Sequence, residues 1–218
     1  TQNTYCTSCG NCTRSCPQAN IAWRLRAPGL EAMQSARPHM DEAWFMVVLL
    51  ALTSLHGLSM MTFWEVWMRG LAQVIGDSGR LLWSFTLGLA ACLAAVGGLY
   101  ALLAAATHRL TGGAQPFTRS LASFAFVALP LAFAYHMAHN LNHLVRESAG
   151  LGGVLQNPLG VDALPLGLAE KQVRHMSLLV HQDTVFALQA GLLVLGFVLA
   201  VGIVRHRGAA LLGAGAEG

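Results

Sequence analysis

The sequence contains few charged residues. Only 11% of its 218 residues are Asp, Glu, Lys or Arg, whereas 55% are hydrophobic and the mean hydropathy is +0.52. A soluble domain carries about 25% charged residues. A chain so poor in charge cannot cover a globule with a water-compatible surface. A soluble protein is therefore excluded, and a membrane protein is predicted.

Clustered positive charge is absent as well. The 13 Lys and Arg exceed the 10 acidic residues by only three, and they are scattered along the chain. Proteins that bind nucleic acid concentrate their basic residues in a patch, so we expect no nucleic-acid partner. The first forty residues also lack an apolar core of the length that a signal peptide needs.

Cysteine is scarce, but four of the five cysteines, Cys6, Cys9, Cys12 and Cys16, fall within eleven positions and are followed by Pro17. The spacing C-x2-C-x2-C-x3-C-P is the ferredoxin run in which thiolates hold an iron–sulfur cube. A structural zinc site usually has two C-x2-C pairs a dozen or more residues apart. Two disulfides would give the proline no role. The pattern predicts a [4Fe-4S] cluster, with zinc and disulfides as the alternatives.

This run resembles one half of a bacterial [4Fe-4S] ferredoxin. Joined to the apolar sequence that follows, it is similar to the membrane-bound polyferredoxin-like subunits of nitrate, nitrous oxide and related respiratory systems. The resemblance implies electron transfer and redox partner subunits. In two-cluster ferredoxins the fourth cysteine of a run binds the other cluster, but Cys92 is distant and no second run exists. Either Cys16 closes the same cluster, or a partner or an upstream segment supplies another set.

The predicted fold is mainly α, with a four-helix transmembrane bundle after a short ferredoxin-like segment. A helix needs about 20 apolar residues to cross the hydrocarbon core. The expected spans are residues 43–68, 81–107, 117–145 and 184–204. The expected organisation is an iron–sulfur segment 1–30, an interfacial linker 31–42, a transmembrane domain 43–207 and a tail 208–218.

Positively charged residues predict the orientation of the bundle. If the N-terminus is inside, eight arginines lie on the inner side: Arg14, Arg24, Arg26, Arg37, Arg109, Arg119, Arg205 and Arg207. Five basic residues lie on the outer side: Arg69, Arg80, Arg146, Lys171 and Arg174. Because Lys and Arg are in excess on the cytoplasmic side, we expect an inner-membrane protein with the cluster and both termini in the cytoplasm.

Several of the nine histidines fall inside the expected spans. His56 lies in the middle of the first span, and His136, His139 and His143 lie in the third. At about 100° per residue these three and Asn140 share one helix face. Ionisable groups inside a span are costly unless they have a partner, so they are candidates for a functional site.

Four interpretations of these histidines remain open. His56 with His136 or His143 could ligate a b-type haem from two different spans. His139 and His143, one turn apart, could bind copper or zinc. The histidines could instead accept protons from a quinol, because imidazole titrates near neutral pH. The fourth interpretation is interhelical hydrogen bonding without further function.

The first functional hypothesis is a membrane electron-transfer subunit. Electrons would pass through the Cys6, Cys9, Cys12 and Cys16 cluster, between a quinone pool or an outer-face donor and a redox partner. The alternatives are a cofactor-maturation or metal-maturation protein, in which the cluster reduces a metal at the histidines, and a structural membrane anchor for a reductase.

Overall fold

The computed structural model describes residues 7–22, 25–77, 79–113, 115–176 and 180–213. These residues are mainly helical and include no strand, so the predicted α class is confirmed. The chain forms two compact units, which are described separately. The first comprises Thr1–Leu129 and Leu199–Gly218, and the second comprises Pro130–Val198.

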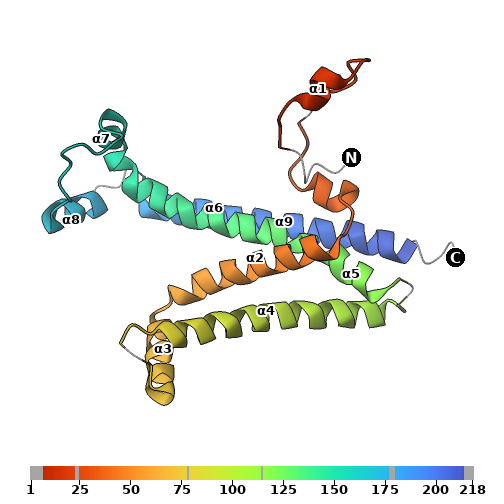
Figure 1. The fold of residues 1–218 in the computed structure, drawn as a ribbon, viewed down its shortest axis with the longest axis horizontal. Helices are drawn as coiled ribbons and strands as arrows, with labels where there is room; N and C mark the ends of the chain where they lie inside the picture. Colours follow the sequence, from red (N-terminus) through yellow and green to blue (C-terminus); the bar gives the residue numbers. More distant parts are fainter. Residues whose placement is uncertain (1–6, 23–24, 78, 114, 177–179, 214–218) are drawn as a thin grey trace. The chain divides into compact units, whose positions relative to one another are not determined.

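Four helical segments are long and apolar enough to cross a membrane, as the sequence predicts (Figure 1). They are α2 (Met40–Ser59), α4 (Leu82–Leu110), a continuous third segment (Phe117–Glu147) and α9 (Gln182–Gly213). The third segment consists of α5 (Phe117–Phe124), the 3-10 turn η2 (Ala125–Val127) and α6 (Ala128–Glu147). Most of their large apolar side chains are exposed, which is the surface expected of helices solvated by lipid. The protein therefore has the character of a multi-pass membrane protein.

The first span is shorter than predicted. Helix α2 ends at Ser59, and Met61 has an extended backbone (φ −77°, ψ 144°) before α3 (Thr62–Ile75) begins. Figure 1 shows that α3 runs in a different direction from α2. The predicted boundary at residue 68 is therefore wrong. The sequence is apolar without interruption across the break, so composition does not show that a second helix, α3, begins there with buried residues on one side only.

Helix α3 is amphipathic. Trp64, Met68 and Ala72 recur every four residues and are buried. They form one stripe that packs against α4, where a Cβ atom on Gly88 would lie 2.9 Å from the Met68 sulfur. On another side of α3, the exposed residues Glu65 and Arg69 form an ion pair of 2.6 Å. A charged pair of this kind suits a helix at a membrane surface better than one inside the hydrocarbon core.

The core of the first unit is formed where α2, the α5–η2 corner and the end of α9 meet. Its buried residues are Ala36, Ala43, Met46, Val47, Ala122, Ala125, Phe126, Ala128 and Ile203. The predominance of alanine lets these helices approach closely. Tyr100 of α4 extends this packing, because its hydroxyl donates a hydrogen bond to the Leu121 carbonyl of α5. Helices α2 and α4 also pack along each other in this unit.

The predicted linker 31–42 contains a short π-helix, η1 (Glu31–Ser35), which docks on α9. Arg207 is only 7% exposed and lies with its guanidinium carbon 3.9 Å from the centre of the Phe126 ring. Its Nε donates to the Ala32 carbonyl at 2.5 Å, and its Nη2 donates to the Ala36 carbonyl at 2.9 Å. Arg207 therefore fixes η1 to the membrane domain.

Helix α9 continues to Gly213, beyond the expected end of the fourth span at residue 204 and into the expected tail that starts at residue 208. The two expected boundaries within this helix stay predictions. Residues 209–212 are Ala-Ala-Leu-Leu. These are strong helix formers, and they extend the helix beyond the basic residues that suggested its end.

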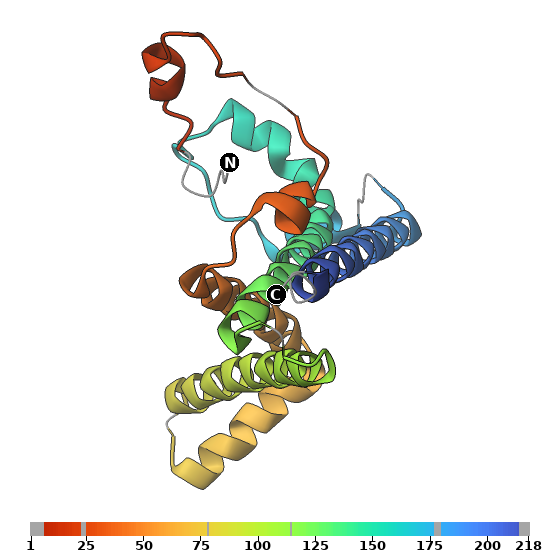
Figure 2. The same ribbon diagram turned by 90° about the vertical axis from the view of Figure 1, so that its right-hand side faces the viewer.

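In the second unit, α6 and α9 are in close contact. A Cβ atom on Gly196 would lie 2.4 Å from Ala134 Cβ and 2.9 Å from the Pro130 carbonyl oxygen, so only glycine fits there. Gln189 Nε2 also donates to the Ala138 carbonyl at 2.8 Å. Figure 2 shows the two helices as neighbours. Two short helices, α7 (Leu151–Gln156) and α8 (Leu168–Met176), lie in the connection between them.

Candidate functional site

The cysteine segment is a short, solvent-exposed structure. Cys6 lies outside the described residues. Cys9 and Cys12 are exposed and Cys16 is half-buried, and all three are free thiols. Cys12 lies in the one-and-a-half-turn helix α1 (Asn11–Ser15), and Cys16 caps the end of that helix. The segment is thus held by turns rather than by a core.

Backbone amides donate hydrogen bonds to two of the sulfurs. The backbone N–H of Asn11, followed by the Thr7 hydroxyl, stabilises the Cys9 thiolate and lowers the pKa of that thiol. The Asn20 N–H donates to Cys16 Sγ at 3.4 Å. Hydrogen bonds from donors to a thiolate favour its charged form, which is the form that ligates metal.

Glycine and proline shape the turns that place these amides. Gly10 has φ +75°, a left-handed conformation, and its carbonyl accepts a hydrogen bond from Thr13 Oγ1 at 2.8 Å. Pro17 follows Cys16 in a turn closed by a 3.2 Å hydrogen bond from the Ala19 N–H to the Cys16 carbonyl. Proline suits the second position of such a turn because its φ is already fixed. Pro17 therefore helps to place the Asn20 N–H beside Cys16 Sγ.

The cysteines are the type of ligand that an iron–sulfur cluster needs, but the described cysteines do not surround a common point. Within the part of the chain that the structure describes, no three His, Cys, Asp or Glu side chains gather closely enough to hold a metal. The full set includes Cys6 and so extends beyond those residues. Two disulfides would require one bond among Cys9, Cys12 and Cys16, which are free. Thiol ligands with amides directed at sulfur fit both the predicted cluster and the zinc alternative.

His56 lies closer to a helix end than the sequence indicates. Because α2 ends at Ser59, the exposed His56 is within the last turn and not in the middle of a span. Its carbonyl accepts a hydrogen bond from Ser59 Oγ at 2.9 Å. His56 belongs to the first unit, whereas His136 and His143 belong to the second. A haem that joins them stays a prediction.

The histidines of α6 form a row with one aromatic neighbour. His139 Nε2 and His143 Nε2 are 3.1 Å apart. The Tyr135 ring is nearly parallel to the His139 ring, with an interplanar angle of 4° and a centroid distance of 6.1 Å, and it also lies edge-on to His136. Asn140 is bonded locally, because its Nδ2 donates to the His136 carbonyl at 2.8 Å. The structure therefore pairs His139 with His143 and leaves His136 beside the pair.

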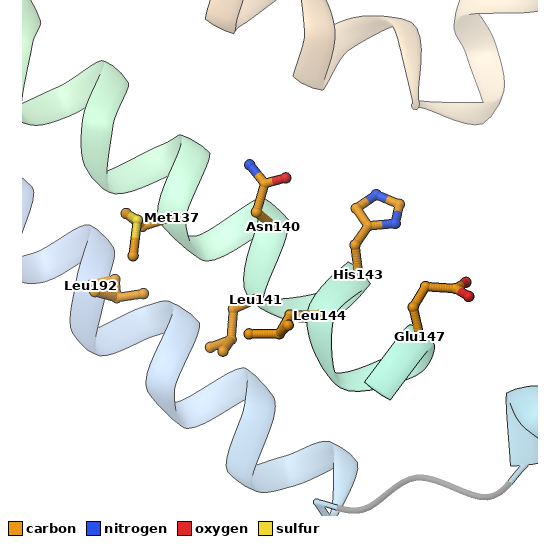
Figure 3. A pocket seen from close by; sticks show the side chains of 7 residues that line it. All are labelled: Met137, Asn140, Leu141, His143, Leu144, Glu147 and Leu192. Atoms are coloured by element: carbon orange, nitrogen blue, oxygen red, sulfur yellow. The ribbon is translucent and has the colours of Figure 1, made fainter. Parts of the chain in front are cut away.

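A pocket of about 480 Å³ lies between α6 and α9 next to this row (Figure 3). Asn140, His143 and Glu147 extend from α6 on its polar side, whereas Leu141 and Leu144 point toward Leu192 of α9. The lining residues are Met137, Asn140, Leu141, His143, Leu144, Glu147 and Leu192. Apolar walls with a few polar groups are typical of a ligand site.

Sequence reasoning missed three residues that shape these sites. Tyr135 lies one turn before His139 and Glu147 lies one turn after His143, and the i, i+4 periodicity could have revealed both. Arg207 was expected only as one of the inner basic residues. Nothing in the local sequence distinguishes it from Arg205, because its partners lie about 170 residues away.

Comparisons of the chain with protein-family models, with curated proteins and with solved structures gave no match. The resemblance to polyferredoxin-like subunits therefore depends on the cysteine spacing and the apolar helices. The chain is a mainly helical protein with four helices suited to a lipid bilayer and a cysteine-rich segment before the first of them.

Proposed function

We propose that this chain is a membrane-bound electron-transfer subunit in which Cys6, Cys9, Cys12 and Cys16 hold a [4Fe-4S] cluster. The observation that carries the proposal is the spacing C-x2-C-x2-C-x3-C-P of these cysteines, and the Asn20 N–H that donates to Cys16 Sγ at 3.4 Å supports it. Ligand thiolates carry negative charge and need such donors in place of water. A bound cluster would supply a site that accepts and releases one electron.

The exposure of the cysteines suits an electron carrier. Cys9 and Cys12 are both exposed. Exposure lets a redox partner approach the metal centre closely. Hydrogen bonds to sulfur and solvent contact are two of the factors that set a cluster's reduction potential. In this proposal, the Asn11 and Asn20 amides would tune the potential, and the exposed face would meet the partner.

The proposed setting is the inner membrane, with the cysteines and both termini in the cytoplasm. The excess of arginine on that side supports this orientation, and a reducing compartment suits unpaired thiols. Electrons would pass between the membrane quinone pool or an outer-face donor and a redox partner subunit.

Replacing one ligand tests the proposal. Cys9→Ser removes a thiolate and is expected to abolish the low-temperature electron paramagnetic resonance (EPR) signal of the dithionite-reduced protein. Iron and acid-labile sulfide should fall with the signal. Cys92→Ser is the matched control, because Cys92 lies in α4 away from the motif and should keep the full signal. Both variants should insert into the membrane in similar amounts.

Two results would reject the proposal. One is an EPR signal in Cys9→Ser as strong as that of the parent protein. The other is a protein, purified anaerobically, that contains one zinc per chain and no sulfide, which would assign the cysteines to a structural zinc site.

A further inference from the structure

The geometry points to a second, separate site, in which His139 and His143 bind one divalent transition-metal ion of the zinc, copper(II) or nickel class. This inference goes beyond the proposed electron-transfer role and does not depend on the cysteine segment. The two histidines lie in the second unit, on α6, and the cysteines in the first. No redox step is assigned to the site.

The distance between the two imidazoles supports this inference. Their Nε2 atoms are 3.1 Å apart. Two nitrogens that ligate a tetrahedral ion at about 2.0–2.1 Å lie roughly 3.3 Å from each other. A small rotation of the rings, which moves the Nε2 atoms by a few tenths of an ångström, would therefore bring both to ligand distance without moving the helix. An i, i+4 histidine pair on one helix face is a known way to present two ligands to zinc.

Neighbouring groups hold the first ring in place. The Tyr135 ring lies parallel to the half-buried His139 ring on one side, and the His143 ring meets it at 67° with a centroid distance of 4.7 Å. A ligand whose orientation is fixed before binding loses less entropy when the ion arrives. Tyr135 is thus a positioning residue for the site.

The site has open coordination positions. Among the described residues, the pair is not joined by a third His, Cys, Asp or Glu close enough to complete a metal-holding group. The remaining positions are therefore available to water or to an incoming ligand. The exposed carboxylate of Glu147 lies one turn beyond His143 on the polar side of the pocket (Figure 3), where it attracts cations. Imidazole and water ligands favour borderline ions such as zinc, copper(II) and nickel over calcium and magnesium.

Copper(II) is the probe that tests the site most directly. The full-length protein in detergent, with its cysteines alkylated so that only imidazoles compete, is titrated with copper(II). The EPR spectrum is then examined for hyperfine coupling to ligand nitrogens. We expect one ion per chain with two coupled nitrogens. His139→Gln and His143→Gln should each weaken binding at least tenfold and remove one coupled nitrogen. His136→Gln, a substitution on the same helix beside the pair, is the control and should leave both readouts unchanged.

A measurement on the unaltered chain guards against misfolded variants. Zinc should protect His139 and His143 from modification by diethylpyrocarbonate and should not protect His136 to the same extent. The inference fails if zinc protects none of the three, or if His139→Gln binds copper as tightly as the parent protein. Either result would assign the 3.1 Å contact to a hydrogen bond between two neutral imidazoles. The cluster signal of the unalkylated protein reports separately on the proposed function.

Discussion

Arg207 shows how one buried side chain joins distant parts of the chain. Its guanidinium donates to the carbonyl of Ala32, the second residue of η1, and to the carbonyl of Ala36, just after η1, and it covers the Phe126 ring. Hydrogen bonds from a charged donor and a cation–π contact replace the water that a buried guanidinium loses. The sequence alone could not predict this contact, because both arginines of the Arg-His-Arg run look alike.

Replacement of Arg207 should destabilise the first unit. Arg207→Met removes two charge-assisted hydrogen bonds and a cation–π contact, and we expect a loss of about 2–4 kcal/mol in unfolding free energy. Thermal unfolding of the purified protein in detergent measures this loss. Arg205→Met is the control, because Arg205 is exposed on the same helix and should change the midpoint little. Equal midpoints for the two variants would contradict the structural role of Arg207.

The cysteines illustrate what residue spacing can predict. Their order and the trailing proline were enough to predict a ligand set, because the motif is local in sequence. The hydrogen bond from Asn20 to Cys16 and the turn at Pro17 are also local. The ligand set itself stays a prediction. The function of the α6 histidines depends on groups that are distant in sequence, so the spacing of the histidines could not decide between a haem site, a metal site and helix packing.

At the scale of elements, hydropathy located four apolar segments but missed the helix break after Ser59 in the first of them. Helices α2 and α3 merge in a hydropathy profile, because both are rich in large apolar residues. Their face patterns differ, however, since α3 buries only the stripe of Trp64, Met68 and Ala72. A search for four-residue periodicity within the long apolar stretch would have found the boundary.

The contact of α6 with α9 depends on a glycine. Gly196→Leu would place a side chain where Ala134 and the Pro130 backbone already lie, so the helices would have to separate. We expect a loss of about 1–3 kcal/mol or more, as for overpacking of a tight core. The effect should appear as a lower unfolding temperature in detergent. Gly191→Leu, at a glycine of the same helix whose Cβ position is open, should be tolerated.

For the whole molecule, composition was sufficient to predict the class. Low charge and four long apolar segments require a membrane protein whatever the packing, and the described helices agree. Composition could not predict the division into two units at Pro130, because the third apolar segment is continuous in hydropathy across it. The change from a 3-10 turn to an α-helix just before this proline is its local structural counterpart, since proline cannot donate to the preceding turn.

An even number of crossings predicts that both ends of the chain lie on one side of the membrane. A reporter enzyme that is active only in the cytoplasm, fused after residue 213, should be active. The same reporter fused at Gly160, in the connection between α6 and α9, should be silent. Activity in the second fusion and silence in the first would reverse the orientation proposed from the arginines.

The docking of η1 also limits how far the cysteines can travel. Glu31 lies fifteen positions after Cys16, and the chain is secured to α9 at the next residue, Ala32. A polypeptide spans at most about 3.3–3.6 Å per residue, so this stretch reaches no more than roughly 50 Å. The docking point of η1 therefore sets the largest distance from α9 at which the described cysteines can lie. In the proposed function, a redox partner must bind within that distance of the docking point.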